Sequence, residues 1–146
     1  IAVVNLMGTM YLESLDNPFF CIDKILEQID TPNIFVDFHA EATSEKKAMG
    51  FYLEKKVTAV IGTHTHVQTS DETILGGHTA YITDAGMTGP ERSVLGVESE
   101  IIIKKLKYHT PVKFVESSNP ASINGVVVSF DEKSGKATNI SRIIMH

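Results

Sequence analysis

The order of strand and helix patterns in this sequence predicts an α/β fold with a parallel or mixed sheet. An apolar strand pattern covers residues 1–7, a helical stripe covers about 18–30, and strand, helix and strand patterns follow as far as Ile61. A strand–helix–strand order requires crossover connections, which make successive strands parallel. The 146 residues are enough for one domain with a buried core.

The first helix, over about residues 18–30, has a signal at each end. Pro18 suits a first turn, and Thr31-Pro32 stops the helix. Its apolar stripe consists of Cys21, Ile22, Ile25, Leu26 and Ile29. Cys21 is the single cysteine, so it has no internal disulfide partner, and its place in the stripe indicates a buried structural thiol rather than a nucleophile.

The middle of the chain repeats the strand and helix order. We expect a strand at about 33–38, then a helix that is capped by Thr43 or Ser44 and ends before Val57, and then a strand over 57–61. A short strand near 80–82 leads into a loop over 83–90. This loop contains two glycines between Asp84 and Pro90, which indicates specific turns and an ordered backbone.

The last third changes character. A helix is expected over about 98–108, with Ile101, Ile102 and Leu106 facing inward. Strand patterns follow at 112–116, 123–130 and 138–145, and a turn over 133–136 joins the last two.

Composition and charge exclude several classes of protein. A hydrophobic content of 42% with 21% charged residues is typical of a folded domain, and the net charge of −5 argues against non-specific nucleic-acid binding. No apolar run is long enough for a membrane span. The lone cysteine suits a reducing compartment, so a cytoplasmic location is expected. Because the sequence starts inside a strand pattern without Met, it indicates a processed product or a piece of a longer protein.

Two histidine clusters stand where predicted core strands end. His39 follows the strand at 33–38, and His64 and His66 follow the strand at 57–61. Ligands of such sheets gather at the carboxyl ends of the strands, and residues two apart on extended backbone face the same side. Imidazole is the commonest protein ligand for transition metals. We therefore predict that His39, His64 and His66 bind metal.

The other candidate groups are weaker. Asp37, Glu41 and Asp84 lie close to the histidines in sequence, so they are candidates for the site as well. His78, His109 and His146 fall in a predicted surface turn, between elements and at the terminus, and are read as solvated residues. The sequence has no nucleophile elbow, phosphate-binding loop or dinucleotide fingerprint.

Three stretches resemble the YmdB-type calcineurin-like metallophosphoesterases. They are FVDFHAEATSEK at 35–46, GTHTHVQT at 62–69 and AYITDAGMTGP at 80–90, and the likeness covers nearly the whole chain. The resemblance implies an α/β/β/α sandwich of mixed sheets flanked by helices, and bacterial phosphodiesterase activity on small cyclic nucleotides. It also implies two metal ions, most often iron or manganese with zinc as a further candidate.

The resemblance implies roles for the candidate residues. His39 and His64 would bind one metal and His66 the other, while Asp37, Glu41 and Asp84 would orient the imidazoles or face the substrate. The family's Gly-Asp, Gly-Glu-Asn and Gly-Asn-His motifs, which supply the remaining ligands and the general acid, do not occur in this sequence. The chain therefore resembles the C-terminal portion of such an enzyme, with no catalytic acid of its own.

Three hypotheses follow. The first is a portion of a dinuclear phosphodiesterase that alone retains at most one metal, has little activity, and self-associates through the apolar strand at 1–7. The second is a non-enzymatic module that keeps half of a metal or nucleotide site. The third is a mononuclear zinc hydrolase that uses only His39, His64 and His66.

Overall fold

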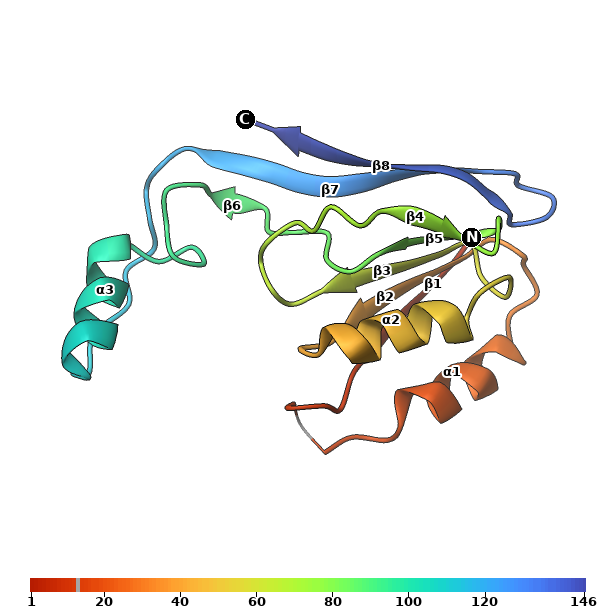
Figure 1. Ribbon diagram of the computed structural model, residues 1–146, viewed down its shortest axis with the longest axis horizontal. Coiled ribbons are helices and arrows are strands. Elements are labelled where there is room, and N and C mark those ends of the chain that lie inside the picture. The colour runs from red at the N-terminus through yellow and green to blue at the C-terminus, as the bar shows by residue number, and fades with distance from the viewer. Residues whose placement is uncertain (13) are drawn as a thin grey trace.

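The predicted α/β order is present in the computed structural model, which describes residues 1–12 and 14–146 (Figure 1). The strands form a five-stranded sheet in the order β1-β2-β3-β5-β4 and a second sheet in the order β6-β7-β8. The elements in chain order are β1 (Ala2–Met7), α1 (Pro18–Leu26), β2 (Ile34–His39), α2 (Thr43–Tyr52), β3 (Ala59–Thr63), β4 (Thr73–Leu75), β5 (Thr79–Ile82), β6 (Gly89–Pro90), α3 (Ser99–Tyr108), β7 (Ala121–Phe130) and β8 (Ala137–Met145).

The larger sheet is mixed, as expected. Strands β1, β2, β3 and β5 pair in parallel, and β4 pairs antiparallel to β5. The register sets Met7 beside His39 and His39 beside Thr63. The carboxyl ends of β1, β2 and β3 therefore meet at one edge of the sheet, which is where the histidine clusters lie.

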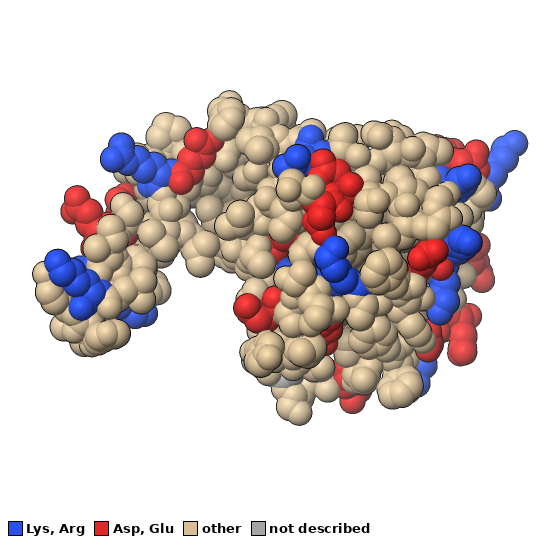
Figure 2. Space-filling model, in the orientation of Figure 1, with Lys and Arg blue, Asp and Glu red and all other residues tan. Residues whose placement is uncertain are grey.

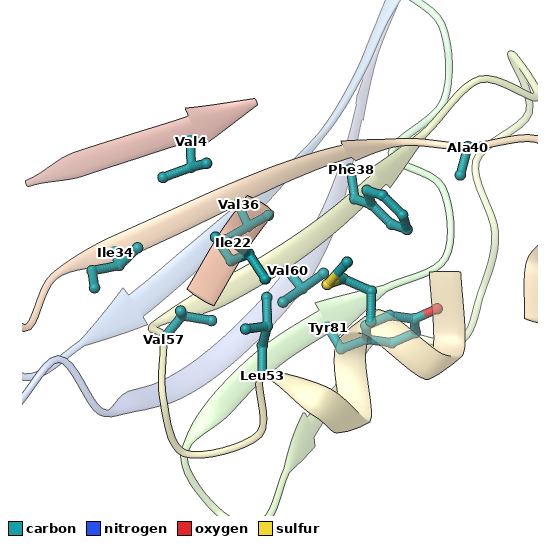
Figure 3. Close-up of a cluster of buried hydrophobic side chains, with 11 residues drawn as sticks. Val4, Ile22, Ile34, Val36, Phe38, Ala40, Leu53, Val57, Val60 and Tyr81 are labelled. Carbon is teal, nitrogen blue, oxygen red and sulfur yellow. The ribbon is translucent and has the colours of Figure 1, made fainter. Parts of the chain in front are cut away.

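Helices α1 and α2 cover one face of this sheet and enclose the main core (Figures 1 and 3). The alternating residues Ile34, Val36 and Phe38 of β2 point into this layer and are buried. Ile22 of α1 and Leu53, just after α2, close the layer from the helix side and are fully buried. This alternation is the pattern expected of a strand between two packed layers.

The hairpin of β7 and β8 covers the opposite face (Figure 1). The rings of Phe35 and Phe130 meet edge to face, with centroids 5.4 Å apart. A second apolar cluster joins Ile82 of β5 to Ala137 and Ile140 of the hairpin. The molecule thus has a helix layer, a mixed sheet and a second sheet, which confirms the predicted fold class of mixed sheets flanked by helices.

Several element boundaries differ from expectation. Helix α1 ends at Leu26 rather than near 30, because Gln28 and Ile29 donate to carbonyls only three residues back in a tightened last turn. The capping prediction for Thr43 and Ser44 is wrong, because Ala42 occupies the N-cap and no side chain caps α2. The strands β4 and β6 were not expected, since each is too short to show a pattern.

The region around α3 departs most from expectation. Leu106 was expected inside, but it is 66% exposed and no residue of α3 is buried. Residues 112–116 form no regular strand, and Glu116 makes only an isolated bridge with Val97. Figure 1 shows α3 standing away from both sheets, and Figure 2 shows an indentation between this arm and the body. The apolar side of α3 therefore has no sheet to pack against within residues 1–12 and 14–146.

Surface features refine three other expectations. Cys21 is partly rather than fully buried. In the face that Figure 2 shows, acidic side chains lie among the basic ones instead of leaving a continuous basic patch. No helix in the described part of the chain combines the length and hydrophobicity needed to cross a bilayer.

Candidate metal centre

The three predicted histidines lie together at the carboxyl edge of the larger sheet. His39 ends β2, whereas His64 and His66 lie in the loop that follows β3. All three line one cavity of about 210 Å³, together with Thr63, Gly86 and Met87. We call this cavity the histidine site.

His39 and His64 are in direct contact. The Nε2 atom of His39 is 3.1 Å from the Nδ1 atom of His64, and the two rings meet edge to face with centroids 4.9 Å apart. Two imidazole nitrogens bound to one ion at about 2.1 Å would be separated by roughly 3.0–3.4 Å. The observed spacing therefore fits two ligands of one metal ion.

A hydrogen-bond chain sets the orientation of His39. The Thr63 hydroxyl donates to Oδ1 of Asp37 over 3.0 Å, and Nδ1 of His39 lies 3.1 Å from the same hydroxyl. A hydroxyl has one proton, so Thr63 must accept from Nδ1–H of His39. The Nε2 atom is then the unprotonated one and keeps its lone pair for a ligand. Asp37 is held in turn by the Asn5 amide, 2.8 Å away.

Glu41 acts on the other imidazole. Its Oε2 atom is 2.5 Å from Nε2 of His64, and its side chain is half exposed. Of the three acidic candidates, Glu41 alone among the described residues bonds an imidazole directly, while Asp37 reaches His39 through Thr63. The bridging role of Thr63 was missed in the sequence, although its place at the end of β3 beside His39 was a usable signal.

His66 faces the same cavity but is more exposed than the other two histidines. It is exposed, and its Nδ1 atom lies 3.3 Å from the sulfur of Met87. Within residues 1–12 and 14–146, no carboxylate bonds to His66, and its one side-chain contact of this kind is with Met87. His66 is therefore the most open of the three imidazoles to a ligand from outside.

Asp84 supports the backbone of the site rather than an imidazole. It is 1% exposed, and it accepts hydrogen bonds from the amides of Thr65 and Gly86 and from Nζ of Lys46. Burial alone would raise the pKa of this carboxyl, but these bonds lower it below its ordinary value of 3.8. Because Thr65 lies between His64 and His66, Asp84 holds the loop that carries both.

Lys46 was not identified from the sequence. A lysine inside a helix is ordinarily solvated, yet this one is 1% exposed. A signal was present, because Lys46, Met49 and Leu53 follow the helical spacing of a buried stripe.

Strained backbone marks the same loop. His64 has φ of 125° and His66 has φ of 63°, values that side chains other than glycine rarely adopt. Such strain persists where surrounding structure enforces it, and it clusters at functional sites. Close packing contributes here, because a Cβ on Gly62 would lie 1.8 Å from the carbonyl oxygen of Thr83.

The donor set is incomplete for a full metal centre. Within residues 1–12 and 14–146, no group of three or more His, Cys, Asp or Glu side chains is arranged to hold a metal ion. Two converging imidazoles with a spare lone pair fit part of the coordination sphere of one ion. The metal-binding roles of His39, His64 and His66 stay predictions.

The remaining histidines lie outside this site. His109 and His146 are exposed as expected, and His146 bonds to Glu91. His78 lies in the expected turn but is only partly exposed, and its Nδ1 atom is buried with no hydrogen-bond partner in the described residues. The expectation of a solvated His78 therefore holds only in part.

Comparison with known proteins identifies the family. A sequence model of the YmdB-like proteins matches residues 1–143. The chain belongs to the YmdB-like family. It is 48% identical over 148 aligned positions to a 2′,3′-cyclic-nucleotide 2′-phosphodiesterase of Bacillus subtilis. That alignment covers all of this chain and 56% of the Bacillus protein, so this YmdB-like chain spans about half the length of its relative.

Solved structures support the same fold. A Thermus thermophilus protein of unstated function superposes with a TM-score of 0.91 at 37% identity, over 98% of this chain and 56% of its own. A Mycoplasma pneumoniae protein described as a novel phosphatase superposes with a TM-score of 0.89 at 36% identity, over 98% and 52%. The YmdB-like chain thus has the fold of about half of that phosphatase.

Proposed function

We propose that this YmdB-like chain is the histidine-bearing part of a metal-dependent phosphodiesterase that hydrolyses small cyclic nucleotides. The observation that carries the proposal is the contact between Nε2 of His39 and Nδ1 of His64, 3.1 Å apart in a cavity also lined by His66. The similarity to a Bacillus subtilis 2′,3′-cyclic-nucleotide 2′-phosphodiesterase supports a 2′,3′-cyclic or 3′,5′-cyclic substrate.

We assign His39 and His64 to one metal ion and His66 to a second. Two ions, iron or manganese in the first place and zinc as a further candidate, would supply a nucleophile from water at neutral pH and stabilise charge on the phosphoryl group. The chain's own residues hold the ligands: Asp37 and Thr63 fix the tautomer of His39, and Glu41 orients His64.

The acidic half of the centre is proposed to lie outside this chain. Two cations about 3.5–4 Å apart need anionic ligands between them, and among the described residues Glu41 is the only carboxylate bonded to an imidazole of the histidine site. We therefore infer that these 146 residues alone bind at most one ion weakly and have little activity.

A binding module without catalysis is the second candidate. It is favoured by the lack of a group of three metal-binding side chains within residues 1–12 and 14–146. Such a module would bind one ion or a nucleotide and hydrolyse nothing. A mononuclear zinc hydrolase remains a third hypothesis, and it requires turnover with one zinc per chain.

The test uses the protein of the full reading frame that contains this chain. We expect about two equivalents of metal and hydrolysis of 2′,3′-cyclic AMP, and we expect His39→Ala and His64→Ala each to lower kcat/KM by at least about a hundredfold. The control is His109→Ala, an exposed histidine beyond the site that should leave metal content and rate unchanged.

Other results would select the other hypotheses. Metal binding without hydrolysis of any phosphodiester would establish the binding module. Full activity of the isolated 146 residues with one zinc would establish the mononuclear hydrolase.

A further inference from the structure

We propose that a second cavity, beside the histidine site, binds the nucleoside part of a nucleotide whose phosphate lies at the histidines. The inference rests on the proposed function, because it assumes a phosphate at that site. It adds a substrate-binding role for Ser122 and Asn124 of β7, at the opposite layer of the fold.

The second cavity adjoins the histidine site. It has a volume of about 430 Å³, within the range of roughly 300–1,000 Å³ that small-molecule sites occupy. His66 and Met87 line both cavities. One ligand can therefore reach both, with its phosphate on the imidazoles and its remainder beyond Met87.

Ser122 offers an unused polar group inside this second cavity. Its side chain is 5% exposed and lines the cavity wall, opposite Gly89 of β6. None of the side-chain hydrogen bonds among the described residues involves its hydroxyl, and this oxygen is not one of their buried unpaired polar atoms, so it is open to the cavity. A hydroxyl that faces a cavity can donate to a ligand or accept from it without breaking an existing hydrogen bond within the protein. The cavity is the place from which such a ligand can come.

Asn124 presents a second group on the same side. It lies two residues beyond Ser122 on β7, so the two side chains share one face of the strand. Its Nδ2 atom donates to the Met87 carbonyl over 2.7 Å. The amide nitrogen is thereby turned toward the protein, and Oδ1 remains as the acceptor for a ligand's N–H or O–H group.

The remaining residues that line the second cavity indicate which end of the nucleotide it binds. Apolar side chains of Met87, Leu95 and Ile144 line the cavity beside polar ones, and such a mixed lining suits a nucleobase, which has apolar faces and polar edges. The carboxylate of Glu91, which bonds to His146, also lines it. A negative group repels phosphate, so the phosphate belongs at the histidine end and the base at this end.

The test measures binding as well as turnover in the metal-loaded, full-length protein. Calorimetry compares adenosine 3′-monophosphate with inorganic phosphate, which lacks the nucleoside. We expect Ser122→Ala and Asn124→Ala each to lower the affinity for adenosine 3′-monophosphate by about threefold to tenfold more than the affinity for inorganic phosphate. The ratio of kcat/KM for 2′,3′-cyclic AMP to that for bis(4-nitrophenyl) phosphate should fall by a similar factor.

Matched controls come from the other end of the hairpin. Asn139→Ala and Ser141→Ala change the same residue types at exposed positions of β8 that do not line the cavity. These variants should keep both ratios at the wild-type value. Wild-type ratios in the Ser122 and Asn124 variants would overturn the proposal, as would an equal loss for nucleotide and inorganic phosphate.

The outcome also separates this proposal from the proposed function. If the protein hydrolyses both diesters but neither the affinity ratio nor the kcat/KM ratio depends on Ser122 or Asn124, only the nucleoside site is contradicted. If the protein hydrolyses neither diester but its affinity for nucleotide still depends selectively on these residues, the proposed hydrolase function is contradicted and the nucleoside site is supported.

Discussion

Nζ of Lys46 lies 3.0 Å from Oδ2 of Asp84, and both side chains are 1% exposed. The pair joins helix α2 to the loop after β5, and the same Asp84 oxygen accepts the Thr65 amide over 2.8 Å. The buried lysine therefore neutralises the carboxylate that holds the loop between His64 and His66. This pair couples the core to the histidine site.

Removing Lys46 should destabilise the fold strongly. Lys46→Met leaves the Asp84 carboxylate buried without its cation, which costs about 3–5 kcal/mol in the free energy of unfolding. Lys47→Met is the matched control, because the next lysine of α2 is half exposed and its ion pair with Asp71 is worth at most about 1 kcal/mol. Urea unfolding of both variants measures the difference, and equal losses would contradict a special role for Lys46.

Stability should fall in acid through two carboxylates. Burial opposes ionisation of Asp71 and Asp84, but hydrogen bonds from Thr83 and Thr69 to Asp71, and from Thr65 and Gly86 to Asp84, lower both pKa values below 3.8. Their contribution is therefore complete above about pH 4 and is lost as the pH falls through the lowered folded-state values. The free energy of unfolding, measured from pH 7 to pH 2, should stay level and then drop. Asp84→Asn should flatten that drop, and an unchanged acid limb would refute the assignment.

Thr63 should control metal affinity without binding metal. Thr63→Val keeps the shape but removes the hydroxyl between Asp37 and His39, so the affinity for Mn²⁺ should fall by about 10- to 100-fold in the full-length protein. Thr63→Ser should restore it, and Thr73→Val, at an exposed position of β4, should not change it. Calorimetric titration with Mn²⁺ measures the effect, and a Thr63→Val variant with wild-type affinity would remove Thr63 from the site.

The backbone of His66 should favour glycine. Because φ is 63° there, His66→Gly should be more stable than His66→Ala by about 1 kcal/mol, while both lose the imidazole. Thr65 is the control, because its φ is not in the left-handed region. There Thr65→Ala should be more stable than Thr65→Gly. Thermal unfolding compares the four variants. Equal stability of the two His66 variants would show that no strain is stored there.

Strand β1 should drive self-association of the 146-residue chain. It is an outer strand; Val3 within it is 74% exposed, and Ile1, just before it, is 77% exposed. The open outer edge of an apolar strand is a template for pairing with another copy. Val3→Lys should lower the apparent mass in light scattering, while Asn139→Lys on β8 should not. A monodisperse monomer of the unchanged chain would contradict this prediction.

Local patterns predicted the frame of the fold because secondary structure follows short periodicities. The strand of residues 33–38, with its alternating burial, and the helix beginning at Pro18 were both found from residue spacing. His39, His64 and His66 were placed at strand ends for the same reason. The apolar pattern of α3 was misread because periodicity shows that a helix has an apolar side but not whether a neighbour covers it.

By itself, the sequence determined the order of the longer helices and strands, the YmdB-like family and the position of the three histidines at the ends of β2 and β3. Tertiary structure decided the contacts that give these residues their properties. Lys46 meets Asp84 across 38 positions of sequence, and Thr63 meets Asp37 across 26. Such pairs form only when strand register and helix packing bring distant segments together, because no local spacing encodes which side chain lies opposite another.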